Sequence, residues 1–150
     1  MRPYPQKPPF NEEELLAFLN EAPIARLGTH NPDGTIHMTS VYFKYDDGCI
    51  LIGTQDISHK IRNIKQNPHV TVLIDNQQPP WKAVIIYGDA SLEYDNVIEK
   101  RASIFERYMP TEDALESAKG LASNFVSVVI RITPKQIISY DYSKEGMISR

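Results

Sequence analysis

Between residues 50 and 70 the chain reads ILIGTQDISHKIRNIKQNPHV, which passes from one apolar run through an amphipathic segment into the next. Isoleucines recur at helical spacing in and beside 58–67, and this pattern stops before Pro68, because the residue preceding a proline resists helical dihedral angles. The stretch therefore predicts a short helix between two strands, at 49–54 and 70–74.

Short β-rich runs separated by turn signals occupy most of the remaining chain. The turns at 31–34 and 46–48 are typical of hairpins, and Gly88 inside a long apolar run indicates a bulge or a close backbone approach. The strands are predicted at 24–29, 36–45, 49–54, 70–74, 83–94, 125–133 and 136–140. Because their order never repeats the β-α-β unit, they favour a mainly β fold, an antiparallel barrel with appended helices.

Two further segments are predicted to be helical. Asn11 and Glu14 form a capping box ahead of an apolar pattern, which predicts a helix over 12–20. Helical spacing returns over 95–108, and the polar stretch that follows, up to Ser123, is expected to contain another helical turn or two.

The composition fits a single domain. Residues 1–10 hold four prolines and are predicted to form an extended arm, which leaves 11–150 as the domain. No apolar run approaches the length needed to span a bilayer, and the N-terminus lacks a signal-peptide core, so a cytoplasmic location without membrane contact is expected. A net charge of -3 gives no reason to expect nucleic acid as a partner. The single cysteine, Cys49, is interpreted as structural.

The helix predicted at 58–67 carries its positive charges at the wrong end. A helix N-terminus holds partial positive charge from unpaired N–H groups, so Lys60 and Arg62 should destabilise it. A bound phosphate would offset that cost, because free N–H groups, the hydroxyls of Thr54 and Ser58 and the Lys60 ammonium could converge on it, with His59 and Arg62 as further donors. Alternatively, Lys60 and Arg62 pair with some of the 19 acidic residues at the surface, and spacing alone does not choose between the two.

Three parts of the sequence carry a family resemblance. They are Ile24–Thr29 with the hairpin Asn31–Thr35, the patterns Ser58-x-Lys60-x-x-Asn63 and Asn67-Pro68-x-Val70, and Tyr140-Asp141-Tyr142 near the end. Together they resemble the pyridoxamine 5'-phosphate oxidase-like FMN-binding split barrels, over about residues 15–142. The resemblance implies a six-stranded antiparallel split β-barrel that forms a homodimer, with FMN sites in the interface.

The resemblance also implies a set of cofactor-binding residues. Thr54, Ser58 and Lys60 are expected to bind the cofactor phosphate, with His59 as a further donor. The isoalloxazine ring is expected to lie along the second strand at Thr39, Ser40 and Val41. Lys44 is expected to reach the cofactor if its side chain points inward. Trp81, on a loop after two prolines, is expected to pack in the dimer interface or to stack on the cofactor of the partner subunit.

Several positions depart from pyridoxamine-phosphate oxidases proper. His59 stands where these enzymes usually carry an arginine, their second-strand arginine is replaced by small or neutral residues, and Ala83 lies near the position of their glutamine. Their C-terminal arginine-and-histidine segment is missing too. The resemblance is therefore to the broader branch, whose members use FMN or the deazaflavin F420, and in a few cases haem. FMN is the first expectation because the phosphate motif suffices for it, and basic residues by the cleft, Arg26, Arg62 and Lys82, are the candidates for the acidic tail of F420.

The function expected from this resemblance is that of a flavin-dependent oxidoreductase acting on a small organic substrate, with NAD(P)H or another small reductant as electron donor. The four histidines lack the close spacing of a metal site, so no metal is expected. The sequence names no catalytic acid or base. A non-catalytic carrier or sensor that binds flavin or haem is therefore the alternative function.

Overall fold

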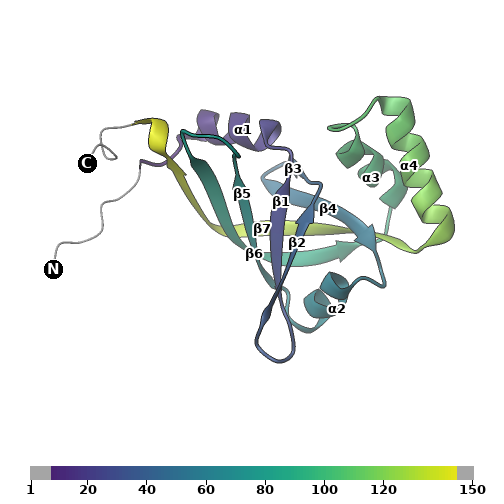
Figure 1. Ribbon diagram of the computed structural model, residues 1–150. Coiled ribbons are helices and arrows are strands. Elements are labelled where there is room, and N and C mark those ends of the chain that lie inside the picture. The colour runs from purple at the N-terminus through teal and green to yellow at the C-terminus, as the bar shows by residue number, and fades with distance from the viewer. Residues whose placement is uncertain (1–7, 145–150) are drawn as a thin grey trace.

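The computed structural model describes residues 8–144 as a curled antiparallel sheet of seven strands with helices around it (Figure 1). The elements are α1 (Glu12–Glu21), β1 (Ala25–His30), β2 (Ile36–Val41), β3 (Lys44–Asp46), β4 (Cys49–Gln55), α2 (His59–Gln66), β5 (His69–Asp75), β6 (Lys82–Glu93), α3 (Val97–Phe105), α4 (Thr111–Asn124), β7 (Ser127–Asp141) and a 3₁₀ turn (Tyr142–Lys144). The strand order is β2-β1-β5-β6-β7-β4-β3, so the two outermost strands follow each other in the chain. The mainly β split-barrel prediction is confirmed.

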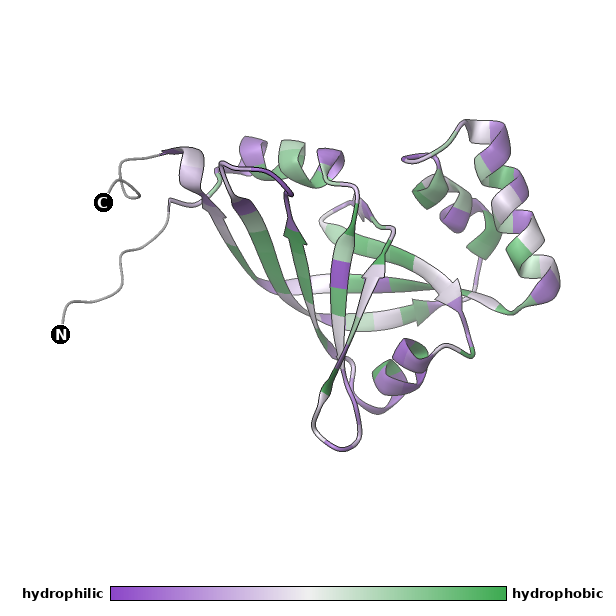
Figure 2. Ribbon diagram, viewed as in Figure 1, coloured by the Kyte–Doolittle hydropathy of each residue, from purple (hydrophilic) through white to green (hydrophobic). Residues whose placement is uncertain are grey.

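The concave side of the sheet holds the main hydrophobic core. Along β5 the residues Val70, Val72 and Ile74 are buried in alternation, and each such side chain contributes about 1.5–3 kcal/mol to folding. Figure 2 shows apolar residues concentrated on the strands, with polar residues on the loops and on much of the helical surface. Leu19 of α1 joins this core, whereas Ile104 of α3 packs in a separate cluster with side chains from β4 and β7. Helix α3 therefore lies on the opposite side of the sheet from the main core.

The N-terminal helix begins as its sequence predicts. The Asn11 side chain accepts a bond from the Glu14 N–H, and the Glu14 carboxylate accepts one from the Asn11 N–H, both at 2.8 Å. The capping box is thereby confirmed. Residues 8–10 of the predicted arm lie along the end of β7, where the Pro8 carbonyl accepts from the Asp141 N–H at 2.8 Å. The rest of the arm, residues 1–7, and the end of the chain, residues 145–150, lie outside the described residues.

The segment 36–45 is two strands rather than the single strand predicted. The Phe43 N–H donates to the Tyr108 hydroxyl at 3.1 Å, and the Phe43 carbonyl accepts from Arg107 at 2.5 Å. Both backbone groups of Phe43 thus bond to side chains just after α3, and so they do not take part in the strand ladder. The chain turns there, and the described sheet has seven strands rather than the six that the family resemblance implies.

The strands predicted at 125–133 and 136–140 are one strand, β7, which continues through Pro134. Tyr87 pairs with Gln136 but Gly88 pairs with Pro134, so the register with β6 shifts by one residue at this point. Because a bulge already interrupts the ladder, a proline without an N–H is tolerated. A Cβ on Gly88 would lie 2.5 Å from the Thr133 carbonyl oxygen. The bulge and close approach predicted at Gly88 are confirmed.

The polar stretch after α3 forms the 14-residue helix α4, not the turn or two predicted. Its face toward α3 is made by small side chains, since Ala114 and Ala118 are both fully buried. Alanines at that spacing give a weak hydrophobic signal, which explains the underestimate. No helix between residues 8 and 144 combines the length and the apolar character that a bilayer crossing needs.

Candidate cofactor-binding site

The predicted phosphate residues meet where β4 leads into α2. The Thr54 hydroxyl donates to the Ser58 hydroxyl at 3.3 Å, and Ser58 is the N-cap residue of α2. Ser58 makes no side-chain bond to the helix backbone, and the first turn of α2 contains no acidic residue. The positive end of the helix dipole is therefore uncompensated, as the sequence indicates.

Lys60 is half-buried at this helix end. Among residues 8–144 no carboxylate forms an ion pair with it. Burial lowers the pKa of the Lys60 ammonium below its ordinary value, because desolvation disfavours the charged form. The surface ion pair considered as the alternative for Lys60 is therefore not formed within the described residues. A bound anion would compensate the charge that burial desolvates.

His37 of β2 completes the positive region. Its ring packs against that of His59, with centroids 4.3 Å apart and the planes tilted by 32°. The pKa of His37 is lowered, first by burial and then by the charges of His59 and Lys60 nearby. We call His37, His59, Lys60 and Arg62 the α2 cluster. Sequence reasoning missed His37, although it falls on the same half-buried face of β2 as Thr39 and Val41 by simple alternation.

His59 is oriented by partners rather than free to bind a ligand through its ring nitrogens. The Asn31 side-chain oxygen accepts bonds from Asn63 at 2.9 Å and from His59 Nε2 at 2.7 Å, which places the His59 proton on Nε2. His59 Nδ1 then accepts from Arg62 at 3.3 Å. The buried Asn63 also donates to Thr29 at 3.0 Å, so this polar network fixes α2 onto the β1–β2 hairpin.

The predicted ring-contact residues on β2 do not share one face. Thr39 and Val41 are half-buried, and Val41 packs against the main core, while Ser40 between them is exposed. The Thr39 hydroxyl is buried without a hydrogen-bond partner in the described chain. A ligand running along β2 would therefore meet its backbone and alternating side chains.

Two other predicted residues lie away from the α2 cluster. Lys44 donates to the Ser103 hydroxyl of α3 at 2.5 Å. Trp81 lies between β5 and β6, is about half exposed, and its carbonyl accepts from the Tyr142 N–H at 3.0 Å. Within residues 8–144 neither side chain forms a hydrogen bond or an ion pair with Lys60 or Ser58. Residues 8–144 also contain no group of three or more His, Cys, Asp or Glu side chains arranged to hold a metal ion.

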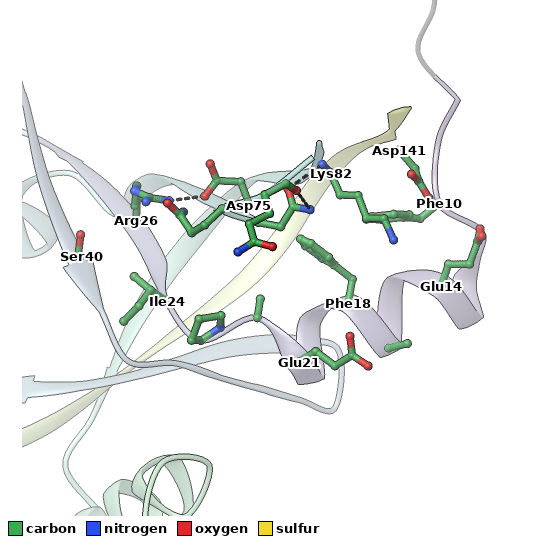
Figure 3. Close-up of a pocket in the computed structure, with 16 residues that line it drawn as sticks. Phe10, Glu14, Phe18, Glu21, Ile24, Arg26, Ser40, Asp75, Lys82 and Asp141 are labelled. Carbon is green, nitrogen blue, oxygen red and sulfur yellow. Dashed lines mark hydrogen bonds and ion pairs between the residues drawn. The ribbon is translucent and has the colours of Figure 1, made fainter. Parts of the chain in front are cut away.

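A cavity of about 810 Å³ lies between α1 and the adjoining ends of β5 and β6. In Figure 3, Phe18 points from α1 toward this space and Arg26 is paired with Asp75 across it. Four carboxylates line the cavity, those of Glu14, Glu21, Asp75 and Asp141. Arg26 and Lys82 also line it, and four carboxylates against these two cations leave a net negative charge, so the α2 cluster is the better candidate for a phosphate site.

A family model described as pyridoxamine 5'-phosphate oxidase matches residues 11–141. The chain belongs to the pyridoxamine 5'-phosphate oxidase-like family. This confirms the resemblance seen in the sequence. No curated protein matches the chain.

Solved structures of similar fold include proteins of different stated function. A conserved hypothetical protein from Mycobacterium tuberculosis is 25% identical with a TM-score of 0.78, covering 88% of this chain and 85% of its own. An F420 reductase is 21% identical with a TM-score of 0.64, covering 81% and 93%. A haem-storage protein from Vibrio cholerae is 20% identical with a TM-score of 0.68, covering 85% and 94%. At these identities, the F420 reductase and the haem-storage protein show only that their fold is shared with this chain.

Proposed function

We propose that this protein binds a phosphorylated flavin-type cofactor, FMN first and F420 second, and acts as an oxidoreductase on a small organic substrate. The observation that carries the proposal is Lys60, half-buried at the start of α2 without an acidic partner. When bound, the cofactor supplies the electron-transfer chemistry. The donor set at this helix end, an ammonium, two hydroxyls and free backbone N–H groups, fits a phosphate and offers no carboxylate to repel it.

Each residue then has a limited task. Lys60 supplies charge to the phosphate, and Thr54 and Ser58 supply hydroxyl donors or acceptors. Arg62 and His59 hold each other and keep the start of α2 in place. The backbone of β2 from Thr39 to Val41 provides the surface along which the ring lies.

We also propose that two copies of the chain form a homodimer through the outer face of the sheet. Paired residues share a face, so the register places Met38, Gly28, Thr71 and Tyr87 in one row across β2, β1, β5 and β6. Met38 is 54% exposed, and Ile36, Tyr87 and Ile138 on this face are also exposed. A Cβ on Gly28 would lie 2.8 Å from the Met38 sulfur, so glycine lets Met38 lie over β1. Exposed apolar side chains gathered in this way, on a face that also carries the ion pairs Arg26–Asp75 and His69–Asp89, are typical of an interface.

The proposal is tested first by the ultraviolet-visible spectrum of the purified protein, followed by mass analysis of any released chromophore. Flavin absorbance with the mass of FMN supports it, and a deazaflavin mass moves the assignment to F420. A Soret band contradicts the flavin assignment and favours haem. A colourless protein that takes up none of the three on titration contradicts cofactor binding altogether.

Lys60→Ala should weaken FMN binding by about 1.5–3 kcal/mol, or tenfold and more, because it removes a charge-assisted hydrogen bond from a partly desolvated site. Fluorescence titration of the apoprotein with FMN measures this. Lys119→Ala, at an exposed position on α4, is the matched control and should bind FMN as the wild type does. Equal affinity of the Lys60→Ala and Lys119→Ala variants would exclude Lys60 as the phosphate anchor.

A second candidate function, a non-catalytic carrier of flavin or haem, is favoured by one observation. The only histidine on α2, His59, has both ring nitrogens engaged, and no carboxylate pairs with Lys60 in the described chain. The residues of the cluster that lie on α2 itself thus offer no evident acid or base. Bleaching of the bound flavin on addition of NADPH or NADH would favour the oxidoreductase, whereas a stable flavin spectrum with both would favour the carrier.

A further inference from the structure

Arg101 on α3 is a buried cation without a counter-ion. The residue is 7% exposed, and among residues 8–144 no carboxylate forms an ion pair with it. One terminal nitrogen donates to the Ser127 hydroxyl at 3.0 Å, and the buried Nε–H has no partner. The guanidinium also lies 5.5 Å from the centroid of the Phe105 ring. Neutral contacts of this kind do not compensate a buried charge.

Strand β4 is shaped to accept this side chain. A Cβ on Gly53 would lie 2.6 Å from Arg101 Nε and 3.0 Å from its Cγ, so any other residue at position 53 would displace the arginine. A small cavity of about 210 Å³ opens beside the pair. Its opposite wall is formed by Ser40 and Val41 of β2 and by Tyr42, which directly follows that strand. The arginine therefore lines a space bounded by the same strand segment that is expected to support the cofactor ring.

This cavity and the α2 cluster are consecutive along the same two strands. Gly53 directly precedes Thr54 on β4, and Ser40 lies three residues beyond His37 on β2. Three steps along a strand span about 10 Å. Gly53 and Thr54 face opposite sides of β4, as neighbouring residues of a strand do, and within residues 8–144 the edge of β4 at these two residues pairs with no strand other than β7. A ligand anchored by its phosphate at Lys60 and extended along β2 would pass this open edge and bring its far end to Arg101.

We propose that Arg101 is a second cofactor-binding residue, whose guanidinium faces the oxygen-bearing edge of the flavin or deazaflavin ring. The inference rests on the proposed cofactor function and adds a residue at the end of the site away from the phosphate. A bound flavin or deazaflavin would be neutral when oxidised and would carry negative charge once reduced by NAD(P)H or another small donor. A desolvated arginine at that edge binds the reduced form more tightly than the oxidised form, since their attraction is strong in a medium of low polarity.

The test compares Arg101→Met, which removes the charge at similar volume, with Arg101→Lys, which keeps it, and with the control Lys119→Met. Riboflavin and FMN are titrated into each apoprotein. Arg101→Met should weaken binding of both ligands tenfold or more, because both carry the ring, whereas Lys60→Ala should weaken FMN alone. Loss confined to FMN would place Arg101 at the phosphate and overturn the ring assignment, as would unchanged binding of both.

The reduction potential of bound FMN gives a readout that a purely structural arginine would not move. Arg101→Met should favour the oxidised form at least tenfold relative to wild type, about 30 mV or more toward lower potential, and Arg101→Lys should retain most of the wild-type value. An unchanged potential in Arg101→Met overturns the proposal.

Folding of the variants is followed separately. Without cofactor, Arg101→Met should be as stable as the wild type or more so, because an apolar side chain replaces an unpaired buried charge. Gly53→Ala keeps the arginine but displaces it, and it should reproduce the binding loss of Arg101→Met. Full binding by Gly53→Ala would contradict the proposal. If the wild-type protein binds neither FMN nor F420, the proposed function is wrong. If the wild type binds and Arg101→Met binds equally well, only the inference about Arg101 is wrong.

Discussion

At the scale of single residues, His37 reports on the positive charge of the α2 cluster. Its pKa is depressed by burial and by His59 and Lys60, and no carboxylate pairs with it within residues 8–144. Because the folded pKa lies below the unfolded value near 6.5, protonation favours the unfolded chain. The contribution of His37 to stability is therefore fully present above that unfolded value and is lost as the pH falls toward the folded one.

A phosphate bound at Lys60 should reverse this depression. We expect the pKa of His37 to lie below 6.5 in the apoprotein and to rise when FMN binds, since a nearby anion favours the imidazolium. A pH titration of the histidine ring protons by NMR measures both values. Riboflavin, which lacks the phosphate, is the control and should leave His37 unchanged. An equal rise with riboflavin would show that the phosphate lies elsewhere.

At the scale of elements, the parts specified by neighbouring residues are those that sequence reasoning places well. The capping box of α1 and the extent of α2 depend on residues within a few positions, and both agree with prediction. The break after β2 depends on Arg107 and Tyr108, which lie more than 60 residues further along the chain. No local pattern at Phe43 indicates partners at that separation, so the division of 36–45 into two strands could not be predicted from the sequence.

The same distinction applies to the candidate site. Thr54, Ser58 and Lys60 are close in sequence and were identified from the charge at a helix start. Arg101 belongs to helix α3, which packs onto β4. In the sequence it is marked only as a charged residue within an otherwise apolar helix face, between Val97 and Ile104 at helical spacing. Predicting Arg101 as a site residue would require knowing that Gly53 of β4 lies against it in the fold.

The bulge between β6 and β7 provides a test at this scale. Gly88→Ala should destabilise the fold by about 1–3 kcal/mol, because the added methyl group meets the Thr133 carbonyl and cannot be relieved by rotating a side chain. Gly120→Ala is the matched control in α4, where a Cβ meets nothing within 4 Å, and should stabilise by about 0.5–1 kcal/mol. Urea denaturation measures both. Gly88→Ala with wild-type stability would mean that the two strands separate easily at the bulge.

At the scale of the whole molecule, the outer face of the sheet exposes apolar side chains that nothing in a single chain covers within residues 8–144. Met38→Asp places a charge in the exposed apolar row and should convert the proposed homodimer to a monomer, since an unpaired carboxylate would be buried in the interface. Light scattering measures the mass. Leu115→Asp, an equally drastic change on α4, is the control and should leave the mass unchanged. A wild-type monomer would contradict the dimer before either variant is made.

The unpaired cations also bear on how long the protein survives in a cell. Lys60 and Arg101 carry charge that the empty fold desolvates and leaves uncompensated. A ligand that supplies the missing negative charge stabilises the folded chain by mass action, so the apoprotein opens more often and meets proteases in that open form. The abundance of this protein would then follow the supply of its cofactor, and cells short of flavin would hold less of the chain at an unchanged rate of synthesis.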